Sequence, residues 1–194
     1  GAPMQRCASS CCAALAGTNN NINVNPQFVN AAAGDLHLTP GSPCIDTADV
    51  AHGFGVVKDH NEQSRLIDQG LTGNALPDMG AYERSPYSLT WVGEPRVGTL
   101  INFTVQGTGS EVALFVAGVL DNVFFINPYG VFLLGAPSTL VLLGPVLSNM
   151  VCPVAIPDVP MLEGFWFGLQ AVVVPSANPS VGTTTELYRA RIYN

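Results

Sequence analysis

The chain has 194 residues, of which 47% are hydrophobic and 11% charged, and its formal net charge at pH 7 is −7. This length suits one large or two small domains with a buried core. No Lys or Arg occurs between Arg96 and Arg189, which excludes the basic stripe that nucleic-acid binding needs and disfavours anionic lipid. Gly and Pro interrupt every apolar run before the ~18–20 residues of a transmembrane helix, so we expect no membrane-spanning segment.

The first 18 residues are small and rich in Cys and Ala, with no firm period. Five cysteines occur in the chain: Cys7, Cys11, Cys12, Cys44 and Cys152. We expect a disulfide that joins Cys44 to one of the three N-terminal cysteines. The odd count leaves at least one thiol free or paired between molecules, and Cys152 suits a small buried hydrophobe.

Residues 19–30 alternate between apolar and amide side chains. Ile22 and Val24 fall on one face, whereas Asn21, Asn23 and Asn25 fall on the other. Amide side chains can stack from one rung to the next in a β-solenoid. The alternation therefore predicts a strand of a solenoid coil.

Four short motifs follow in a fixed order: residues 25–29 (NPQFV), 34–38 (GDLHL), 41–46 (GSPCID) and 77–83 (PDMGAYE). Their order resembles the closing segment of bacterial extracellular right-handed parallel β-helix proteins, the "choice-of-anchor" or pectate-lyase-like solenoids. The resemblance implies that residues 1–86 form the terminal coil and cap of a parallel β-helix. It also implies an extracellular or cell-surface location, and it carries no catalytic residue across.

Acidic residues near these motifs admit three interpretations. Paired carboxylates could act as acid and base on a glycan, and clustered oxygens could bind calcium. A carboxylate beside a Gly or Pro turn also accepts backbone N–H hydrogen bonds, which is the role we expect. The calcium candidates are Asp46, Asp49, Asp59, Asp78 and Glu83, and no other cofactor is expected.

No nucleophilic constellation is evident. Ser42 lies in Gly-Ser-Pro and lacks the Gly-x-Ser-x-Gly frame of a nucleophile elbow. His37, His52 and His60 have no Ser or Cys context that suggests a triad. We therefore expect a chain that is not an enzyme.

From Leu89 onward, short apolar runs separated by Gly and Pro predict strands within residues 101–105, 111–120, 131–134, 140–143, 165–174 and 184–193. This pattern favours an antiparallel β-sandwich of about seven or eight strands over residues 87–194. Ser85-Pro86 is the expected linker. The whole chain is therefore expected to be all-β, with residues 1–86 and 87–194 as its two domains.

The second half is also similar, more loosely, to the C-terminal sandwich that follows repeat domains in secreted proteins of planctomycete-like bacteria. The similarity rests on its strand rhythm and on residues 156–171. Trp166 is expected to be exposed between two core phenylalanines, Phe165 and Phe167, and to contribute to an interface. Edge pairing with little charge repulsion is expected along Ile101, Phe103 and Val105.

These observations predict a secreted, non-enzymatic structural protein that self-associates into filaments or oligomers, or attaches to the cell envelope, through its β-sandwich. A short solenoid segment cannot bury its own hydrophobic stack, so it needs a neighbour. The alternative is the C-terminal glycan-binding or targeting module of a larger carbohydrate-active β-helix enzyme. Binding to a polysaccharide through Trp166 would distinguish the alternative.

Overall fold

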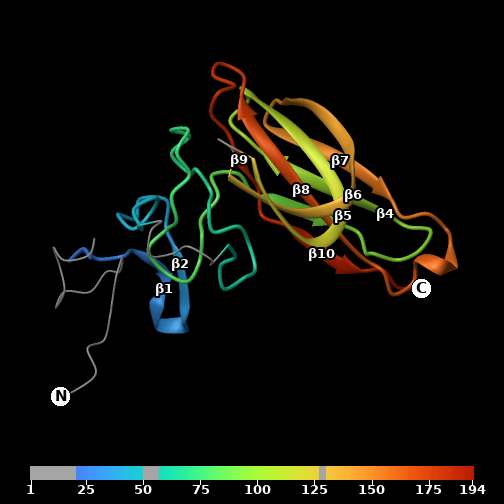
Figure 1. Ribbon diagram of the computed structural model, residues 1–194, viewed down its shortest axis with the longest axis horizontal. Coiled ribbons are helices and arrows are strands. Elements are labelled where there is room, and N and C mark those ends of the chain that lie inside the picture. Colours follow the sequence, from blue (N-terminus) through green and yellow to red (C-terminus); the bar gives the residue numbers. More distant parts are fainter. Residues whose placement is uncertain (1–20, 50–56, 127–129) are drawn as a thin grey trace.

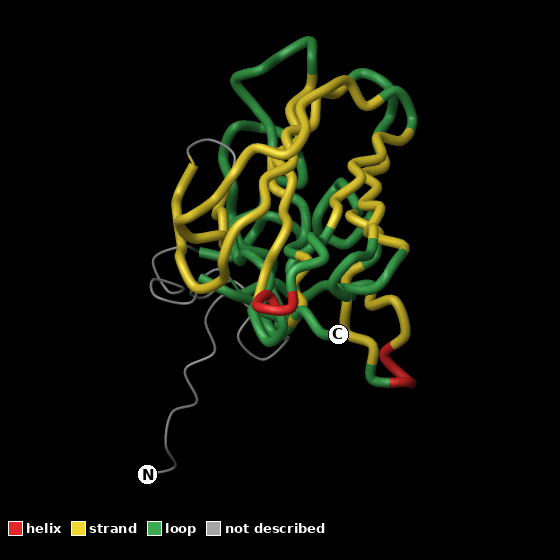
Figure 2. The backbone as a smooth tube through the Cα atoms, turned by 90° about the vertical axis from the view of Figure 1, so that its right-hand side faces the viewer, coloured by secondary structure: helices red, strands yellow, loops and turns green. Residues whose placement is uncertain are grey.

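The computed structural model describes residues 21–49, 57–126 and 130–194, and every structural statement below refers to these ranges. The structure is all-β and its sheets are antiparallel, as expected for the second half of the chain. In the described ranges the helices are two short 3-10 turns, η2 (Ala31–Ala33) and η3 (Pro160–Leu162) (Figure 2). Figure 1 shows the large sheets on one side and the loops of residues 21–86 on the other.

The N-terminal part contains one small sheet, in which β1 (Phe28–Asn30) pairs antiparallel with β2 (Asp35–Leu38). The two strands are joined by η2, and Gly34 follows η2 with a φ of 81°. A parallel pair needs a crossover of about a dozen residues or more, which this short connection cannot supply. The expected coil of a parallel β-helix is therefore wrong for the described residues.

The expected solenoid strand over residues 19–30 is also wrong for residues 21–27, which form a loop, and only residues 28–30 of its described part are a strand, β1. The Asn25 side chain accepts a hydrogen bond from the Gln27 N–H (2.9 Å). Val24 is 47% exposed instead of buried. Asparagine amides that bond their own backbone compete with strand formation, which explains why the alternation misleads here.

Residues 87–194 form two antiparallel sheets from eight strands. The three-stranded sheet has the order β3-β4-β7, and the five-stranded sheet has the order β10-β8-β5-β6 with β9 paired to β8. The strands are β3 (Leu89–Val92), β4 (Leu100–Gln106), β5 (Glu111–Ile126), β6 (Gly130–Val146), β7 (Asn149–Ala155), β8 (Trp166–Pro175), β9 (Thr183–Thr184) and β10 (Tyr188–Arg191).

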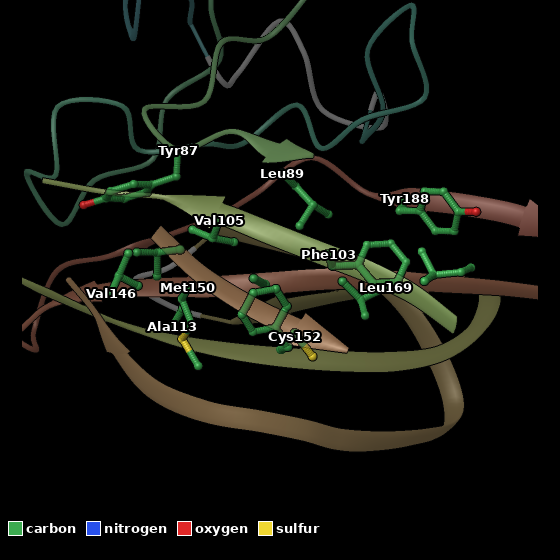
Figure 3. Packing of buried hydrophobic residues seen from close by; sticks show 14 of the residues in the cluster. Tyr87, Leu89, Phe103, Val105, Ala113, Val146, Met150, Cys152, Leu169 and Tyr188 are labelled. Atoms are coloured by element: carbon green, nitrogen blue, oxygen red, sulfur yellow. The ribbon is translucent and has the colours of Figure 1, made fainter. Parts of the chain in front are cut away.

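The two sheets pack face to face around the main hydrophobic core (Figure 3). Phe103 of β4 and Phe115 of β5 are fully buried, as are Leu169 of β8 and Cys152 of β7. Burial of each large apolar side chain stabilises the fold by about 1.5–3 kcal/mol. The alternation of apolar and polar residues along β4 therefore favours this packing, because every second side chain of the strand points into the core.

A second cluster covers part of the outer face of the five-stranded sheet. Its buried residues come from β6, β8 and the segment before β10, with Leu66 of the N-terminal part packed against them: Leu133, Leu134, Val172 and Leu187. The β5–β6 ladder contains three register irregularities. Such bulges bend a hairpin, and here the β6 residues Leu133 and Leu134 join the cluster on the outer face. The outer face of one sheet of the sandwich is thus partly covered by the chain itself.

Gln170 anchors this arrangement from within the sheet. Its side chain is fully buried, its Oε1 accepts from the Leu133 N–H (3.0 Å), and its Nε2 donates to the Thr185 carbonyl (2.9 Å). Both ends of a buried amide are therefore satisfied, which avoids the ~1–3 kcal/mol penalty of an unpaired polar group. Gln170 consequently fixes where β6 crosses the outer face.

The N-terminal part is attached to the sandwich by polar contacts. The Leu187 N–H donates to the Gln63 side-chain oxygen, and the Gln63 amide donates to the Leu187 carbonyl (3.4 Å). Glu62 forms an ion pair with Arg189, and the Asp68 N–H donates to the Thr183 hydroxyl (3.2 Å). Residues 62–68 therefore lie against the segment that carries β9 and β10.

The two described cysteines are both fully buried. Cys152 is a free thiol in the main core, which confirms the prediction that it is a small buried hydrophobic residue. Cys44 lies in a small satellite cluster with Leu38, Ala48 and Met79. Its expected disulfide partners, Cys7, Cys11 and Cys12, fall outside the described residues, so the disulfide stays a prediction.

Candidate functional site

Asp78 joins two of the motif-bearing segments. Its Oδ1 accepts from the Asp46 N–H (2.8 Å), and its Oδ2 accepts from the Arg84 N–H (2.9 Å). The Met79 N–H donates to the Cys44 carbonyl (2.8 Å), which ties the same segments once more. Asp46 has a φ of 50°, a left-handed conformation that Asp tolerates better than most residues. The Asp78 carboxylate therefore holds a turn in place.

Glu83 ends the last motif and its side chain is fully buried. Both carboxylate oxygens accept from the Asp78 N–H (3.0 Å each), and Oε1 lies 3.0 Å from Nη1 of Arg65. Burial raises the pKa of Glu83 well above its ordinary range, the Asp78 carboxylate adds to the rise, and Arg65 opposes it. Burial likewise raises the pKa of Asp78 to about 6. The pair shares one desolvated site with a single nearby guanidinium.

The Asp59 carboxylate is likewise occupied by hydrogen bonds from backbone N–H groups. Its Oδ1 accepts from the N–H groups of Asn61 and Gln63 (2.8 Å each), and its Oδ2 accepts from the Glu83 N–H (2.9 Å). A carboxylate with this geometry closes a turn and ties it to a second segment. Such an arrangement leaves little room for acid–base chemistry on a substrate.

Asp68 and Asp46 complete the network. Asp68 is fully buried and accepts from the N–H groups of Thr72 (3.0 Å) and Gly73 (2.6 Å). Asp46 Oδ2 accepts from the Gly70 N–H (3.0 Å), while its buried Oδ1 has no hydrogen-bond partner. Burial raises the pKa of Asp46. The motif carboxylates thus act as connectors of loops.

The structure links four of the calcium candidates one to the next. Asp46 contacts Asp78, Asp78 contacts Glu83, and Glu83 contacts Asp59, each time through a backbone N–H group. Within the ranges that the structure describes, no group of three or more His, Cys, Asp or Glu side chains could hold a metal ion. Asp49 joins no such group. The predicted calcium site therefore has no support from the described geometry.

Ser42 has the turn role expected of it. Its hydroxyl donates to the Pro26 carbonyl (2.6 Å) and accepts from the Cys44 N–H (3.1 Å). His37 is similarly engaged, because its Nδ1 lies 2.6 Å from Asp35 and its Nε2 lies 3.0 Å from the Asn61 amide. Both polar side chains are thus built into the fold.

An open groove of about 550 Å³ lies between the β1–β2 hairpin and the start of the sandwich. Small-molecule sites are typically ~300–1,000 Å³, so the groove has the size of a ligand site. Its walls come from the hairpin, the segment before β3, the turn between β4 and β5, and the loop before β10. The lining residues are Val29, His37, Leu38, Pro40, Glu83, Arg84, Ser85, Pro86, Tyr87, Ser88, Gln106, Gly107, Thr108 and Glu186.

Two polar groups in this groove have no protein partner among the described residues. Tyr87 is only 4% exposed, and its hydroxyl takes part in no hydrogen bond there. In Figure 3 the Tyr87 ring lies at the border of the core with its oxygen directed away from the cluster. The Glu186 carboxylate is also unpaired, and Arg84 donates only to the Ser85 carbonyl (3.1 Å). These side chains are available to a ligand.

The raised pKa of Glu186 is consistent with its position in the wall of the groove. Glu186 is exposed to solvent, yet burial raises the pKa of its carboxyl group, and the Asp59 carboxylate adds to the rise. His37 and Arg84 act in the opposite direction on the pKa of Glu186, so both side chains lie near it. Sequence patterns could not reveal this site, because Tyr87 and Glu186 lie far apart in the chain and in no shared motif.

The expected interface residues divide into two groups. Ile101, Phe103 and Val105 are each fully buried, and β4 is the central strand of its sheet. The prediction that these residues lie on an edge strand and are free for an interface is therefore wrong. Their apolar side chains pack against the five-stranded sheet instead. Trp166 is 53% exposed, in agreement with the expectation, although Phe165, expected in the core, is 60% exposed.

The outer face of the three-stranded sheet is open to solvent. The register places these residues side by side on it: Thr90, Val92, Leu100, Asn102, Thr104, Gln106, Asn149, Val151, Pro153 and Ala155. None of them is charged. Val92 is 77% exposed, and Leu100 and Val151 are about half exposed. This set is called the open face below.

Two comparisons with known proteins add no relative. No protein-family model matches this chain, and no curated protein sequence matches it. Within the described ranges, none of the helices has the length and hydrophobicity needed to cross a lipid bilayer. Function is therefore argued from the geometry above.

Proposed function

We propose that this chain is a secreted, non-enzymatic structural module that associates with copies of itself through the open face of its β-sandwich. The observation that carries the proposal is the asymmetry of the sandwich. The outer face of the five-stranded sheet is partly covered by the second hydrophobic cluster, whereas the three-stranded sheet presents an uncharged face to solvent. Val92, Leu100 and Val151 place exposed apolar side chains on this uncharged face, and exposed apolar surface of this kind often marks an interaction site.

Charge favours a second copy as the occupant. The chain has a net charge of −7, so two copies repel each other over most orientations. A contact between two open faces places no charged side chain opposite another. It is therefore the orientation in which burial of Leu100 and Val151 meets the least electrostatic opposition.

Strand edges are less suited to the contact. β6 and β7 are the open edges on one side of the sandwich, and each contains proline, at Pro145 and Pro153 respectively. Proline removes a backbone donor and blunts an edge against further pairing. Side-chain contact across the open face is therefore favoured over continuation of a sheet.

The size of the face sets the expected affinity. Three strands spaced about 4.8 Å apart, with about seven residues at about 3.3 Å each, cover roughly 300 Å². A standard interface covers about 800 Å² on each partner. The exposed Leu140 and Leu143 do not enlarge the open face, because they pair with Val116 and Leu114 and therefore lie on the outer face of the five-stranded sheet. Association is therefore expected to be weak and to depend on concentration.

The same geometry supports a non-enzymatic role. Asp59, Asp68, Asp78 and Glu83 each accept hydrogen bonds from backbone N–H groups, which is a connecting function. An extracellular or cell-surface location, with attachment to the envelope, follows from the resemblance to secreted β-helix proteins. It remains part of the proposal.

Concentration-dependent amide NMR tests the surface directly. We expect resonances of β3, β4 and β7 to shift as the concentration rises, because their outer side chains enter the contact. Resonances around Met161, which is 82% exposed in η3, serve as the internal control and should stay constant. Shifts confined to another surface would contradict the proposal.

The alternative function, a glycan-binding or targeting module of a larger carbohydrate-active protein, is favoured by a different observation. The groove that holds Tyr87 and Glu186 offers unpaired polar groups to a ligand. That observation does not depend on self-association.

A further inference from the structure

Tyr87 is the most informative residue of the groove. Its side chain is 4% exposed, and its hydroxyl has no hydrogen-bond partner among the described residues. The hydroxyl itself reaches the groove, since the fully enclosed side-chain oxygens without a partner in the described ranges are Asp46 Oδ1 and Gln69 Oε1. Burial raises the pKa of Tyr87 to about 12, with a further contribution from Glu111. The hydroxyl therefore remains protonated and can both donate and accept.

Other polar side chains line the same groove. Glu186 supplies a carboxylate acceptor, Arg84 supplies guanidinium donors, and Gln106 and Ser88 supply groups that both donate and accept. None of these side chains forms an ion pair with another among the described residues, although Arg84 and Glu186 influence each other electrostatically. In the described part of the chain, the Arg84 guanidinium and the Glu186 carboxylate do not form an ion pair with each other, so a ligand between them could bind both.

We propose that this groove binds a short segment of a neutral carbohydrate, with Tyr87, Arg84 and Glu186 as its principal hydrogen-bonding residues. Each sugar hydroxyl donates and accepts, so a mixed set of donors and acceptors matches it. The carboxylate accepts from neighbouring hydroxyls, and the guanidinium donates to ring or hydroxyl oxygens. Val29, Leu38, Pro40 and Pro86 offer apolar walls to the C–H faces of the sugar.

The charge balance of the groove selects against other ligands. A phosphate or an acidic peptide would meet the Glu186 carboxylate, and a cationic peptide would meet Arg84. A neutral polyhydroxy ligand satisfies both groups at once. This proposal is independent of self-association, because the groove and the open face are lined by different residues apart from Gln106.

The site is a binding site and not a hydrolytic one. Hydrolysis of a glycosidic bond requires two carboxyl groups that flank the bond. Besides Glu186, the groove is lined by Glu83, both oxygens of which are bound to the Asp78 N–H. We therefore expect a bound oligosaccharide to remain intact.

Titration of the full-length chain with neutral oligosaccharides, monitored by amide NMR, tests the proposal. The probes are short homo-oligosaccharides of glucose, xylose, mannose and galactose, with inorganic phosphate and oligo-glutamate as comparators. We expect at least one oligosaccharide to cause saturable shifts at Ser88, Gly107 and Thr108, and no shortening of the sugar. The comparators should cause none there.

Two variants and two matched controls make the assignment specific. Tyr87→Phe removes only a hydroxyl that has no protein partner, so the fold should be unaffected, and Glu186→Gln removes only a charge. Each should weaken binding by about tenfold, which corresponds to about 1.4 kcal/mol. The controls are Tyr193→Phe, whose hydroxyl bonds Glu94, and Glu163→Gln, which is exposed.

Three outcomes would overturn the proposal. The first is the absence of saturable shifts in the groove with every oligosaccharide at millimolar concentration. The second is binding that is equally strong in Tyr87→Phe, Glu186→Gln and the controls. The third is a groove that binds phosphate or oligo-glutamate in preference to the sugars. None of these outcomes bears on whether the open face self-associates.

Discussion

The Asp78 carboxylate accepts a hydrogen bond from the backbone N–H of Asp46, 32 residues earlier in the chain, at 2.8 Å. This contact joins two motifs that are separated in sequence and gives the Asp78 side chain its role, whereas the Asp46 side chain accepts from the Gly70 N–H. Asp78 lies in a desolvated site beside Glu83, so its ionisation is opposed by burial. The consequence is a pH dependence of stability with an unusual sign.

We expect the Asp78 contribution to stability to decrease as the pH rises from about 4 to about 7. The pKa of Asp78 is raised from 3.8 to about 6 in the folded chain, so the folded state retains a proton that the unfolded state has lost. The shift corresponds to at most about 3 kcal/mol. Urea unfolding of the wild type and of Asp78→Asn across this range measures it.

Asp78→Asn carries no titrating group, so its free energy of unfolding should decline less across this pH range. Asp158→Asn, at an exposed position, is the matched control and should follow the wild type. An identical decline in the wild type and Asp78→Asn would show that Asp78 ionises normally in the folded chain.

The two faces of β4 should differ sharply in their tolerance of truncation. Phe103→Ala removes a fully buried ring between the two sheets and should cost about 3–5 kcal/mol of unfolding free energy. Leu100→Ala, on the same strand but half exposed, should cost about 1 kcal/mol or less. Chemical denaturation of both variants provides the comparison. Similar losses would mean that β4 does not separate core from solvent as described.

Part of this fold could be predicted from sequence. The alternation at Ile101, Phe103 and Val105 located β4, and the alternation of Tyr188 and Ile192 against Arg189 and Arg191 is confirmed by their burial. Periodicity reports which side chains share a face, but it does not report which strands are neighbours. The sequence pattern therefore predicts β4 at a sheet edge, although it lies between β3 and β7.

Other elements were missed for identifiable reasons. Residues 131–134 and 140–143 belong to the single long strand β6, because register irregularities allow a strand to continue through Gly135 and Pro137. β7 was overlooked because Pro153 interrupts its pattern, and an edge position tolerates that proline. The groove could not be predicted, since it is made by residues from four separate segments.

Gln63 is expected to control how firmly the N-terminal part is held. Its side chain contacts both the N–H and the carbonyl of Leu187. Gln63→Ala frees both backbone groups, and the amide hydrogen of Leu187 should then exchange about tenfold faster or more. Hydrogen exchange measured by NMR tests this, with the exposed Gln27→Ala as control. Unchanged exchange at Leu187 would show that other contacts suffice.

Cys152 is expected to resist alkylation in the folded chain. Its side chain is fully buried, and burial raises the pKa of the thiol to about 11, so little reactive thiolate is present at neutral pH. Mass spectrometry after iodoacetamide treatment should detect modification of Cys152 only when denaturant is added. Rapid modification without denaturant would contradict its placement in the core.

Sedimentation velocity over a range of concentrations tests the central claim, that the open face associates with a second copy. We predict that the weight-average mass rises above 20.4 kDa as the concentration increases. The Leu100→Glu/Val151→Glu variant should remain at the monomer mass, because paired open faces would then oppose like charges, whereas Met161→Glu should behave as the wild type. A wild type that stays at 20.4 kDa up to millimolar concentration, or a double variant that associates equally well, would contradict the account.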